Sequence, residues 1–164
     1  MKTLFLLRHA KSNSSAAGLP DFDRVLNDRG SKEALAVGTF IREQKLGLDL
    51  ALSSPAVRAR ETTELVLESA ELPLEVRYDQ RIYEAGPLRL LEVVSQVEDD
   101  RSTVLLVGHN PGMEELLQLL TDRAEHMATG TLAKIDFNAA SWSKVPEEKG
   151  SLDWIVKPKE LAEA

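Results

Sequence analysis

Short stretches with strand-like patterns alternate along the chain with longer segments whose apolar residues recur every three or four positions. Short apolar runs are typical of strands, and the longer period is typical of amphipathic helices. Four short segments are predicted strands, at 3–7, 48–54, 74–79 and 102–109. A helical pattern follows each of them, at 28–45, 54–70, 87–97 and 111–122. This alternation predicts a mostly parallel sheet whose strands are joined by helices.

The last part of the chain has a different pattern, in which apolar and polar residues alternate one by one. The apolar positions are Ala133, Ile135 and Phe137 in residues 131–138, and Leu152, Trp154 and Val156 in residues 151–158. Such alternation is typical of half-buried strands, so we expect an antiparallel C-terminal hairpin at one edge of the sheet. Residues 139–150 are a predicted polar loop, and residues 159–164 a frayed helical turn.

Together these patterns predict an α/β fold, a sandwich of helices around a mostly parallel sheet. A chain of 164 residues is long enough to bury one substantial core, so we expect residues 1–164 to form a single domain. Residues 10–27 are a predicted long loop, and long loops in compact domains are often functional. Ser54 and Pro55 are the expected N-cap and first helical residue of the second helix.

The composition excludes several classes of function. The chain has no cysteine, which rules out disulfides and thiolate catalysis. Its net charge of -7 disfavours nucleic acid or an anionic membrane as the main partner. The apolar runs are too short to cross a bilayer, and the N-terminus lacks the pattern of a signal peptide. We therefore expect a cytoplasmic protein, with a monomer as the default state.

Charged side chains gather where three of the predicted strands end. Arg8 and His9 follow the first strand, Arg58 lies one turn into the helix after the second, and His109 follows the fourth. Ligands of open α/β sheets bind beyond the carboxyl ends of the strands, so these residues should share one rim. Helical side chains lean towards the N-terminus of their helix, which directs Arg58 to the same place.

Each of these residues, taken alone, also has a structural explanation. A histidine at a strand end can be a satisfied core or surface group, Arg58 can form a surface ion pair, and residues 108–112 can form a turn. Their convergence favours a cationic pocket, because arginines match phosphate oxygens with two donors each. Cationic neighbours keep a histidine neutral, and neutral imidazole can attack phosphorus. The residues predict a phosphoryl-transfer site that uses no metal or other cofactor, whereas His126 is expected to be structural or exposed.

Four blocks of the sequence resemble the histidine phosphatase superfamily and come in the order of that family. They are LLRHAKS, FDRVLNDRG, SSPAVRARETTE and VGHNPG, within residues 4–112. The short length, Ala10 and the following Lys11 and Ser12 resemble the SixA-type phosphohistidine phosphatases of this superfamily. The resemblance implies a three-layer α/β/α sandwich of the phosphoglycerate mutase-like kind.

The resemblance also implies roles for individual residues. His9 would be the phosphorylated nucleophile, and Arg8, Arg58 and His109 would form the phosphate pocket. No metal would take part. The implied substrate is phosphohistidine on a signalling or phosphotransfer protein.

Three positions depart from the usual pattern of the superfamily. Ala10 replaces a glycine, and Glu61 stands where glutamine is common, so we expect Glu61 to face away from the anion site. Asn110 follows the late histidine, where some members carry an acidic residue as the general acid. Glu84 is the candidate for that role, although a solvated loop carboxylate or a charge at a helix N-terminus explains it equally well.

Residues around the predicted pocket bear on the choice of substrate. We expect Lys11, Ser12 and Asn110 to contact the substrate, with Lys11 and the 10–27 segment at the mouth of the pocket. A phosphoramidate needs no strong acid to leave, and the short connections provide little chain for a lid. Both features favour phosphohistidine on a protein. A phosphomonoesterase acting on a small phosphorylated metabolite and a non-catalytic phosphate-binding module are the alternatives.

Overall fold

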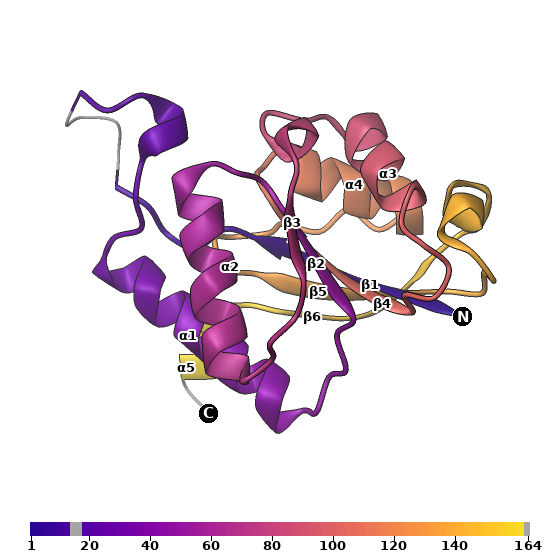
Figure 1. Ribbon diagram of the computed structural model, residues 1–164, viewed down its shortest axis with the longest axis horizontal. Coiled ribbons are helices and arrows are strands. Elements are labelled where there is room, and N and C mark those ends of the chain that lie inside the picture. The colour runs from indigo at the N-terminus through magenta and orange to yellow at the C-terminus, as the bar shows by residue number, and fades with distance from the viewer. Residues whose placement is uncertain (14–17, 163–164) are drawn as a thin grey trace.

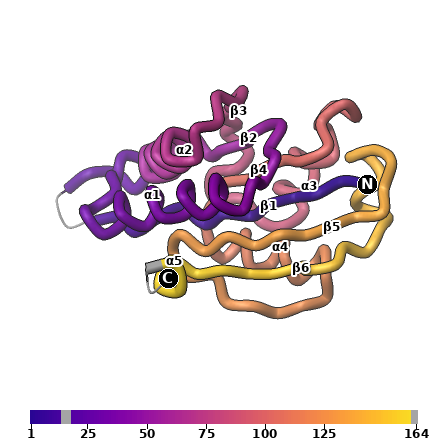
Figure 2. The backbone as a smooth tube through the Cα atoms, turned by 90° about the horizontal axis from the view of Figure 1, so that it is seen from below, coloured from indigo at the N-terminus to yellow at the C-terminus, as the bar shows by residue number. Residues whose placement is uncertain are grey.

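The computed structural model describes residues 1–13 and 18–162, and these residues form a sheet of six strands. The strands are β1 (Lys2–Arg8), β2 (Leu50–Ser53), β3 (Val76–Tyr78), β4 (Thr103–Gly108), β5 (Leu132–Phe137) and β6 (Ser151–Val156). Their order across the sheet is β3-β2-β4-β1-β5-β6. The β1–β4, β2–β4 and β2–β3 pairs are parallel, whereas β5 pairs antiparallel with both β1 and β6. Figure 2 shows β5 and β6 running alongside β1, as predicted for the C-terminal hairpin.

Helices cover both faces of the sheet. The α-helices are α1 (Asp28–Glu43), α2 (Val57–Ala70), α3 (Pro87–Ser95), α4 (Gly112–Thr121) and α5 (Pro158–Ala162), and the 3-10 helices are η2 (Asp21–Asp23), η3 (Gln80–Ile82) and η4 (Trp142–Glu147). Helices α1 and α2 lie on one face, and α3 and α4 on the other (Figure 1). This arrangement confirms the predicted α/β/α sandwich. Among the helices of the described residues, none is long and apolar enough to cross a membrane.

The central strand β1 serves both layers of the core. Leu4 and Leu6 belong to the apolar cluster beneath α3 and α4, whereas Phe5 and Leu7 belong to the cluster beneath α1 and α2. Successive side chains of a strand point to opposite faces, so a strand covered on both sides is apolar at every position. The rigid strand ends at Arg8, directly before His9.

The start of α2 differs from the prediction. The helix begins at Val57 with Ala56 as its N-cap, so the assignment of Ser54 as N-cap and Pro55 as first helical residue is wrong. The Ser54 N–H still donates to β4, which holds this residue in the sheet and delays the helix. Its hydroxyl accepts from the Ala56 N–H at 3.2 Å and lies 2.8 Å from His109 Nε2.

Strand β6 does not keep the predicted alternation. Ile135 pairs with Leu152 while the neighbouring Lys134 pairs with Trp154, so Asp153 is an extra residue that forms a bulge. Leu152 therefore packs on the α3 and α4 side, and Trp154 packs on the α1 and α2 side. The prediction that the three apolar positions of β6 share one side is wrong.

The predicted loop at 139–150 is also more ordered than expected. It contains η4, which buries Trp142 and Val145 in the core beneath α3 and α4. The C-terminal turn begins at Pro158 as α5, and residues 163–164 of the predicted tail lie outside the described residues.

The 10–27 segment leads from β1 to α1. An isolated bridge joins Ser12 to Leu26, and the 3-10 helix η2 lies between them. Residues 14–17 of this predicted loop lie outside the described residues. The bridge and η2 bring the described part of the segment close to the start of α2.

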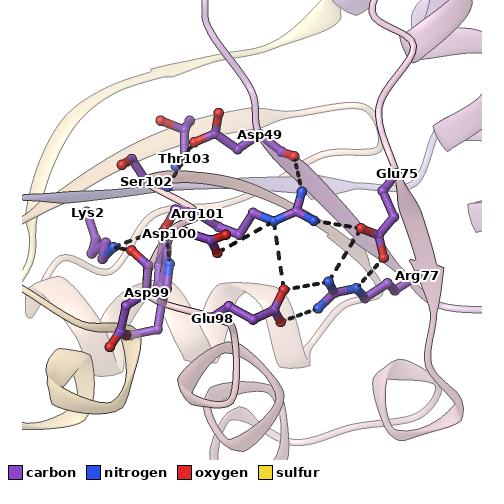
Figure 3. A network of polar contacts seen from close by, with 11 residues as sticks. Lys2, Asp49, Glu75, Arg77, Glu98, Asp99, Asp100, Arg101, Ser102 and Thr103 are labelled. Carbon is purple, nitrogen blue, oxygen red and sulfur yellow. Dashed lines mark hydrogen bonds and ion pairs between the residues drawn. The ribbon is translucent and has the colours of Figure 1, made fainter.

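A network of opposite charges ties together the amino ends of the parallel strands (Figure 3). Arg77 donates to both carboxylate oxygens of Glu98, at 2.6 and 2.7 Å. Arg101 donates to Glu75 at 2.7 Å and to the Asp49 carbonyl at 2.8 Å. Exposed ion pairs contribute little to the stability of a fold, so the main effect of this network is to join the strand ends. It lies at the edge of the sheet opposite to Arg8 and His9.

Candidate active site

The crevice beyond β1 and β4 holds the candidate site. The two strands are parallel neighbours, but the chain leads from β1 to α1 on one face and from β4 to α4 on the other. A crevice opens where neighbouring strands lead to opposite faces. A cavity of about 700 Å³ lies at this point. Its lining includes every site residue predicted from the sequence: Arg8, His9, Lys11, Ser12, Arg58, Glu84, His109 and Asn110.

His9 is buried at the floor of this crevice, with its ring orientation set by the backbone of the next residue. Its Nδ1 lies 2.8 Å from the Ala10 carbonyl oxygen. A carbonyl only accepts, so Nδ1 carries the hydrogen and Nε2 carries the lone pair of the neutral ring. The Nε–H of Arg58 points at this Nε2 from 3.4 Å. Burial, helped by the charges of Arg58 and Arg8, lowers the pKa of His9 to about 3.

His109 lies beside His9, with 5.0 Å between the ring centroids. Burial, together with the nearby charge of Arg58, lowers the pKa of His109 to about 4. Its Nε2 contacts the Ser54 hydroxyl, and its Nδ1 is buried with no hydrogen-bond partner among the described residues. Both imidazoles are therefore neutral at physiological pH.

Arg58 reaches the crevice from the first turn of α2, as its position in the sequence predicted. Only 5% of the residue is exposed. Its Nη1 donates to the Asp21 carbonyl at 2.7 Å, and its Nη2 donates to the Asp21 carboxylate at 3.1 Å. Tyr83 donates to the same carboxylate at 2.6 Å, and Arg24 forms an ion pair with it at 3.1 Å. The bond from Tyr83, followed by Arg58, lowers the pKa of Asp21.

Arg8 is held by the chain segment that follows α4. Its Nη1 donates to the Met127 carbonyl at 3.0 Å, and its Nε is buried without a partner in the described part of the chain. The Asn110 amide donates to the same carbonyl at 2.9 Å and to Glu114 at 2.8 Å. The Asn110 nitrogen is thus engaged with the protein, and it fixes the carbonyl that orients Arg8.

The remaining predicted residues lie at the mouth of the cavity. Lys11 and Glu84 are exposed, and Ser12 is half-buried. Glu84 has a φ of 54°, in the left-handed region that an L-residue rarely adopts. The backbone of Lys11 packs against the start of α1, where a Cβ on Gly30 would collide with the Lys11 carbonyl oxygen. Of the described residues in the 10–27 segment, six line the cavity: Lys11, Ser12, Asn13, Asp21, Arg24 and Asn27.

Two departures from the family pattern are explained by packing. Ala10 is fully buried, and its N–H donates to the Thr62 hydroxyl at 3.0 Å, so the methyl group is accommodated. Glu61 accepts from the Leu26 N–H at 2.9 Å and does not line the cavity, which confirms that it faces away. His126 is exposed and pairs with a carboxylate outside the cavity, in agreement with the expectation.

Sequence reasoning missed Asp21, Arg24 and Tyr83, which all line the cavity. Asp21 lies in the short 3-10 helix η2 and the other two residues lie just after 3-10 helices, where no hydrophobic period marks the direction of a side chain. The only signal was the length and polarity of the 10–27 segment. Tyr83 is adjacent to the predicted Glu84, but a tyrosine after a strand has no signature of its own.

The arrangement suits a phosphate-sized anion. Within the described part of the chain, the cavity lining contains four cationic and two acidic side chains: Arg8, Lys11, Arg24, Arg58, Asp21 and Glu84. The Nε of Arg8 and the Nδ1 of His109 are buried polar atoms that lack partners, and a bound anion would accept from the N–H of Arg8. Among residues 1–13 and 18–162, no group of three His, Asp or Glu side chains has the spacing of a metal site.

Comparisons with known proteins agree with this geometry. Residues 4–88 match the histidine phosphatase superfamily (branch 1). An uncharacterized protein of Mycobacterium tuberculosis is 37% identical over 114 residues, which are 70% of this chain and 69% of that protein. The phosphohistidine phosphatase SixA of Escherichia coli is 23% identical over 159 residues, which are 94% of this chain and 93% of that protein.

A solved structure extends the likeness to the whole fold. A Nakamurella multipartitia protein, named as a candidate phosphohistidine phosphatase SixA, superposes with a TM-score of 0.85 and 29% identity, covering 96% of both chains. The matched segment contains β1, α1 and α2, and with them Arg8, His9 and Arg58. The chain therefore belongs to the histidine phosphatase superfamily, and it is a phosphatase.

Proposed function

We propose that this phosphatase removes the phosphoryl group from phosphohistidine on a protein by transferring it first to His9. The observation that carries the proposal is the hydrogen bond from His9 Nδ1 to the Ala10 carbonyl. It leaves the lone pair on Nε2, next to Arg58, in a ring that burial keeps neutral. A neutral imidazole with an oriented lone pair is a nucleophile for phosphorus.

In the first step, His9 Nε2 forms a bond to phosphorus while the bond from phosphorus to the substrate imidazole breaks. The electron pair of the broken bond goes to the leaving nitrogen. This nitrogen takes a proton from Glu84, or the imidazole leaves as a neutral ring because its other nitrogen already carries a hydrogen. Arg8, Arg58 and His109 stabilise the charge on the equatorial oxygens. Their donors are fixed by packing before the substrate arrives, so little reorganisation is needed.

In the second step, water attacks the phosphoryl group on His9. The bond between Nε2 and phosphorus breaks, inorganic phosphate leaves, and the proton of the water passes to Glu84 or to solvent. The neutral imidazole is regenerated with its hydrogen on Nδ1. These two steps use no metal and no other cofactor.

The mouth of the cavity supports a protein substrate. Lys11, Asn13 and Glu84 are exposed around it, so an imidazole on the surface of another protein can reach His9. The name of the Escherichia coli relative points to the same class of substrate. We further propose that residues 1–164 act as one domain, because both apolar clusters pack on the same sheet.

A second candidate is hydrolysis of a small phosphorylated metabolite. The cavity volume of about 700 Å³ favours it, since cavities of roughly 300–1,000 Å³ enclose small ligands. The two candidates differ in their leaving group: an alcohol needs a proton donor, whereas an imidazole needs a weaker one.

The proposal is tested by trapping the intermediate. The enzyme is mixed with a protein whose histidine has been phosphorylated chemically, quenched, and searched by mass spectrometry for phosphate on His9. The His9→Asn variant should lose this adduct and roughly 10³-fold or more in turnover. The matched control is His126→Asn, which changes the exposed histidine outside the cavity. Undiminished turnover by His9→Asn would refute the covalent mechanism, and a higher kcat/KM for sugar phosphates than for the phosphohistidine protein would favour the second candidate.

A further inference from the structure

Ser54 is buried beside His109, at the end of β2. None of its surface is exposed. Its backbone N–H donates to the Val107 carbonyl at 3.1 Å, which extends the pairing of β2 with β4 and fixes its position. Its hydroxyl oxygen lies 2.8 Å from His109 Nε2 and 3.2 Å from the backbone nitrogen of Ala56.

The direction of the bond to His109 follows from the donors and acceptors around the hydroxyl. A serine hydroxyl has one hydrogen and two lone pairs, and the Ala56 N–H can only donate to it. Within residues 1–13 and 18–162, His109 Nε2 is the only atom in reach that can accept the hydroxyl hydrogen. A buried hydroxyl hydrogen without an acceptor has lost the hydrogen bond to water that it makes in the unfolded chain, which destabilises the fold. The hydroxyl of Ser54 therefore donates, and Nε2 accepts.

This direction decides the tautomer of His109. A neutral imidazole whose Nε2 accepts must carry its hydrogen on Nδ1. That Nδ1 is buried and has no partner among the described residues, although buried polar atoms are normally bonded. His109 lines the cavity beside His9, so an oxygen of a bound phosphoryl group can supply the missing acceptor.

We propose that Ser54 is a positioning residue that holds His109 as the Nδ1–H tautomer, so that this N–H donates to a phosphoryl oxygen during transfer. The role in transfer rests on the function proposed above, whereas the tautomer is a property of the free enzyme. In the other tautomer, Nδ1 would present a lone pair to the anion and repel it. A wrong tautomer removes a catalytic contribution without moving any atom of the backbone.

The experiment compares two neighbouring buried serines. Ser54→Ala removes the hydroxyl that contacts His109. Ser53→Ala is the matched control, because the Ser53 hydroxyl is equally buried but bonds to the Ser54 carbonyl and to Thr63. The tautomer is read from the ¹⁵N resonances of labelled histidines in the free enzyme at neutral pH, and kcat is measured with a chemically phosphorylated histidine protein.

The wild type and Ser53→Ala should show a protonated Nδ1 in His109, and Ser54→Ala should lose this preference. We expect kcat to fall roughly 10–100-fold in Ser54→Ala, by analogy with removal of the hydrogen-bond partner of a metal-bound histidine. Ser54→Thr keeps a hydroxyl and should keep the tautomer, which provides a second test if Ser54→Ala folds poorly.

A wild type with the hydrogen on Nε2 of His109 would overturn the inference, as would an unchanged tautomer in folded Ser54→Ala. The tautomer is measured without substrate, so its outcome is separate from that of the proposed function. If the wild type has the Nδ1–H tautomer and Ser54→Ala loses it, but no phosphohistidine forms on His9, the covalent mechanism is overturned and the control of the tautomer by Ser54 is supported.

Discussion

Arg58 and Asp21 are joined twice, since Nη1 of Arg58 donates to the backbone carbonyl of Asp21 and Nη2 donates to its carboxylate. The pair connects the first turn of α2 with η2 in the segment between β1 and α1. Tyr83 and Arg24 contact the same carboxylate. The arginine that we propose for phosphate binding thus takes its orientation from a segment that has no regular secondary structure beyond one 3-10 turn and one bridge in its described part.

Asp21→Asn should lower kcat/KM about tenfold, the kinetic equivalent of about 1.4 kcal/mol. The amide keeps the shape of the side chain but loses the charge that orients the Arg58 guanidinium. A bond to a charged group is worth about 1.5–3 kcal/mol, and the half-exposed position of Asp21 reduces this. The matched control is Asp23→Asn in the same 3-10 helix, and an equal loss in both variants would contradict the specific role of Asp21.

Glu84→Gln should separate the two candidate substrates. With an alkyl or aryl phosphate that has a poor leaving group, we expect kcat to fall by about 10² or more, because the proton donor is lost. With a phosphohistidine protein, the loss should stay below about tenfold. Glu115→Gln is the control, since Glu115 lines a neighbouring cavity together with Glu84. Equal losses with both substrates would mean that Glu84 does not act as the proton donor.

The two buried histidines should resist protonation far below the usual pKa of about 6.5. Their ring resonances in the free enzyme should titrate with midpoints of about 3 for His9 and about 4 for His109. A midpoint above 6 for either ring would show that burial does not control its charge. The measurement uses samples without phosphate, since a bound anion would favour the charged ring.

The same histidines should make the fold less stable in acid. Because their pKa in the folded state lies below that of the unfolded chain, the unfolded state binds more protons as the pH falls below about 6.5. Above that pH, each histidine makes its full contribution to the free energy of unfolding. This contribution declines as the pH falls towards the pKa of the histidine in the folded state. Between pH 6.5 and 5, one histidine should account for about 2 kcal/mol of the free energy of unfolding. Urea unfolding at both pH values should show a smaller decline for His9→Gln, and an identical decline would contradict the assignment.

Gly30→Ala should destabilise the protein by about 2 kcal/mol, as overpacking typically does. A Cβ at this position would collide with the Lys11 carbonyl oxygen and push apart α1 and the segment at the cavity mouth. Gly47→Ala is the control, because a Cβ there has no heavy atom within 4 Å. Thermal unfolding of both variants tests this, and equal midpoints would show that the contact at Gly30 can relax.

Local sequence patterns were sufficient to predict the layers of the fold and the residues at the floor of the cavity. The unbroken apolar run of β1 requires cover on both faces, and parallel strands align their carboxyl ends. Arg8, His9 and His109 therefore had to stand at one rim once the strands were recognised. Helical side chains lean towards the N-terminus of their helix, and this rule was sufficient to place Arg58 at the same rim.

Local sequence patterns did not predict contacts between segments that lie far apart in the chain. The bulge at Asp153 depends on pairing with β5, so β6 alone could not reveal it. Ser54 resembles an N-cap in sequence, but its N–H donates to the Val107 carbonyl of β4 and its hydroxyl contacts His109.

The sequence by itself determined which side chains stand at the rim of the sheet, because strand ends and helix starts follow from periodicity. Only the tertiary structure decided their hydrogen-bond partners. Asp21 meets Arg58 across 37 positions of the chain, and His109 meets Ser54 across 55. Such bonds form only after the sheet has brought the segments together, and no local period encodes them.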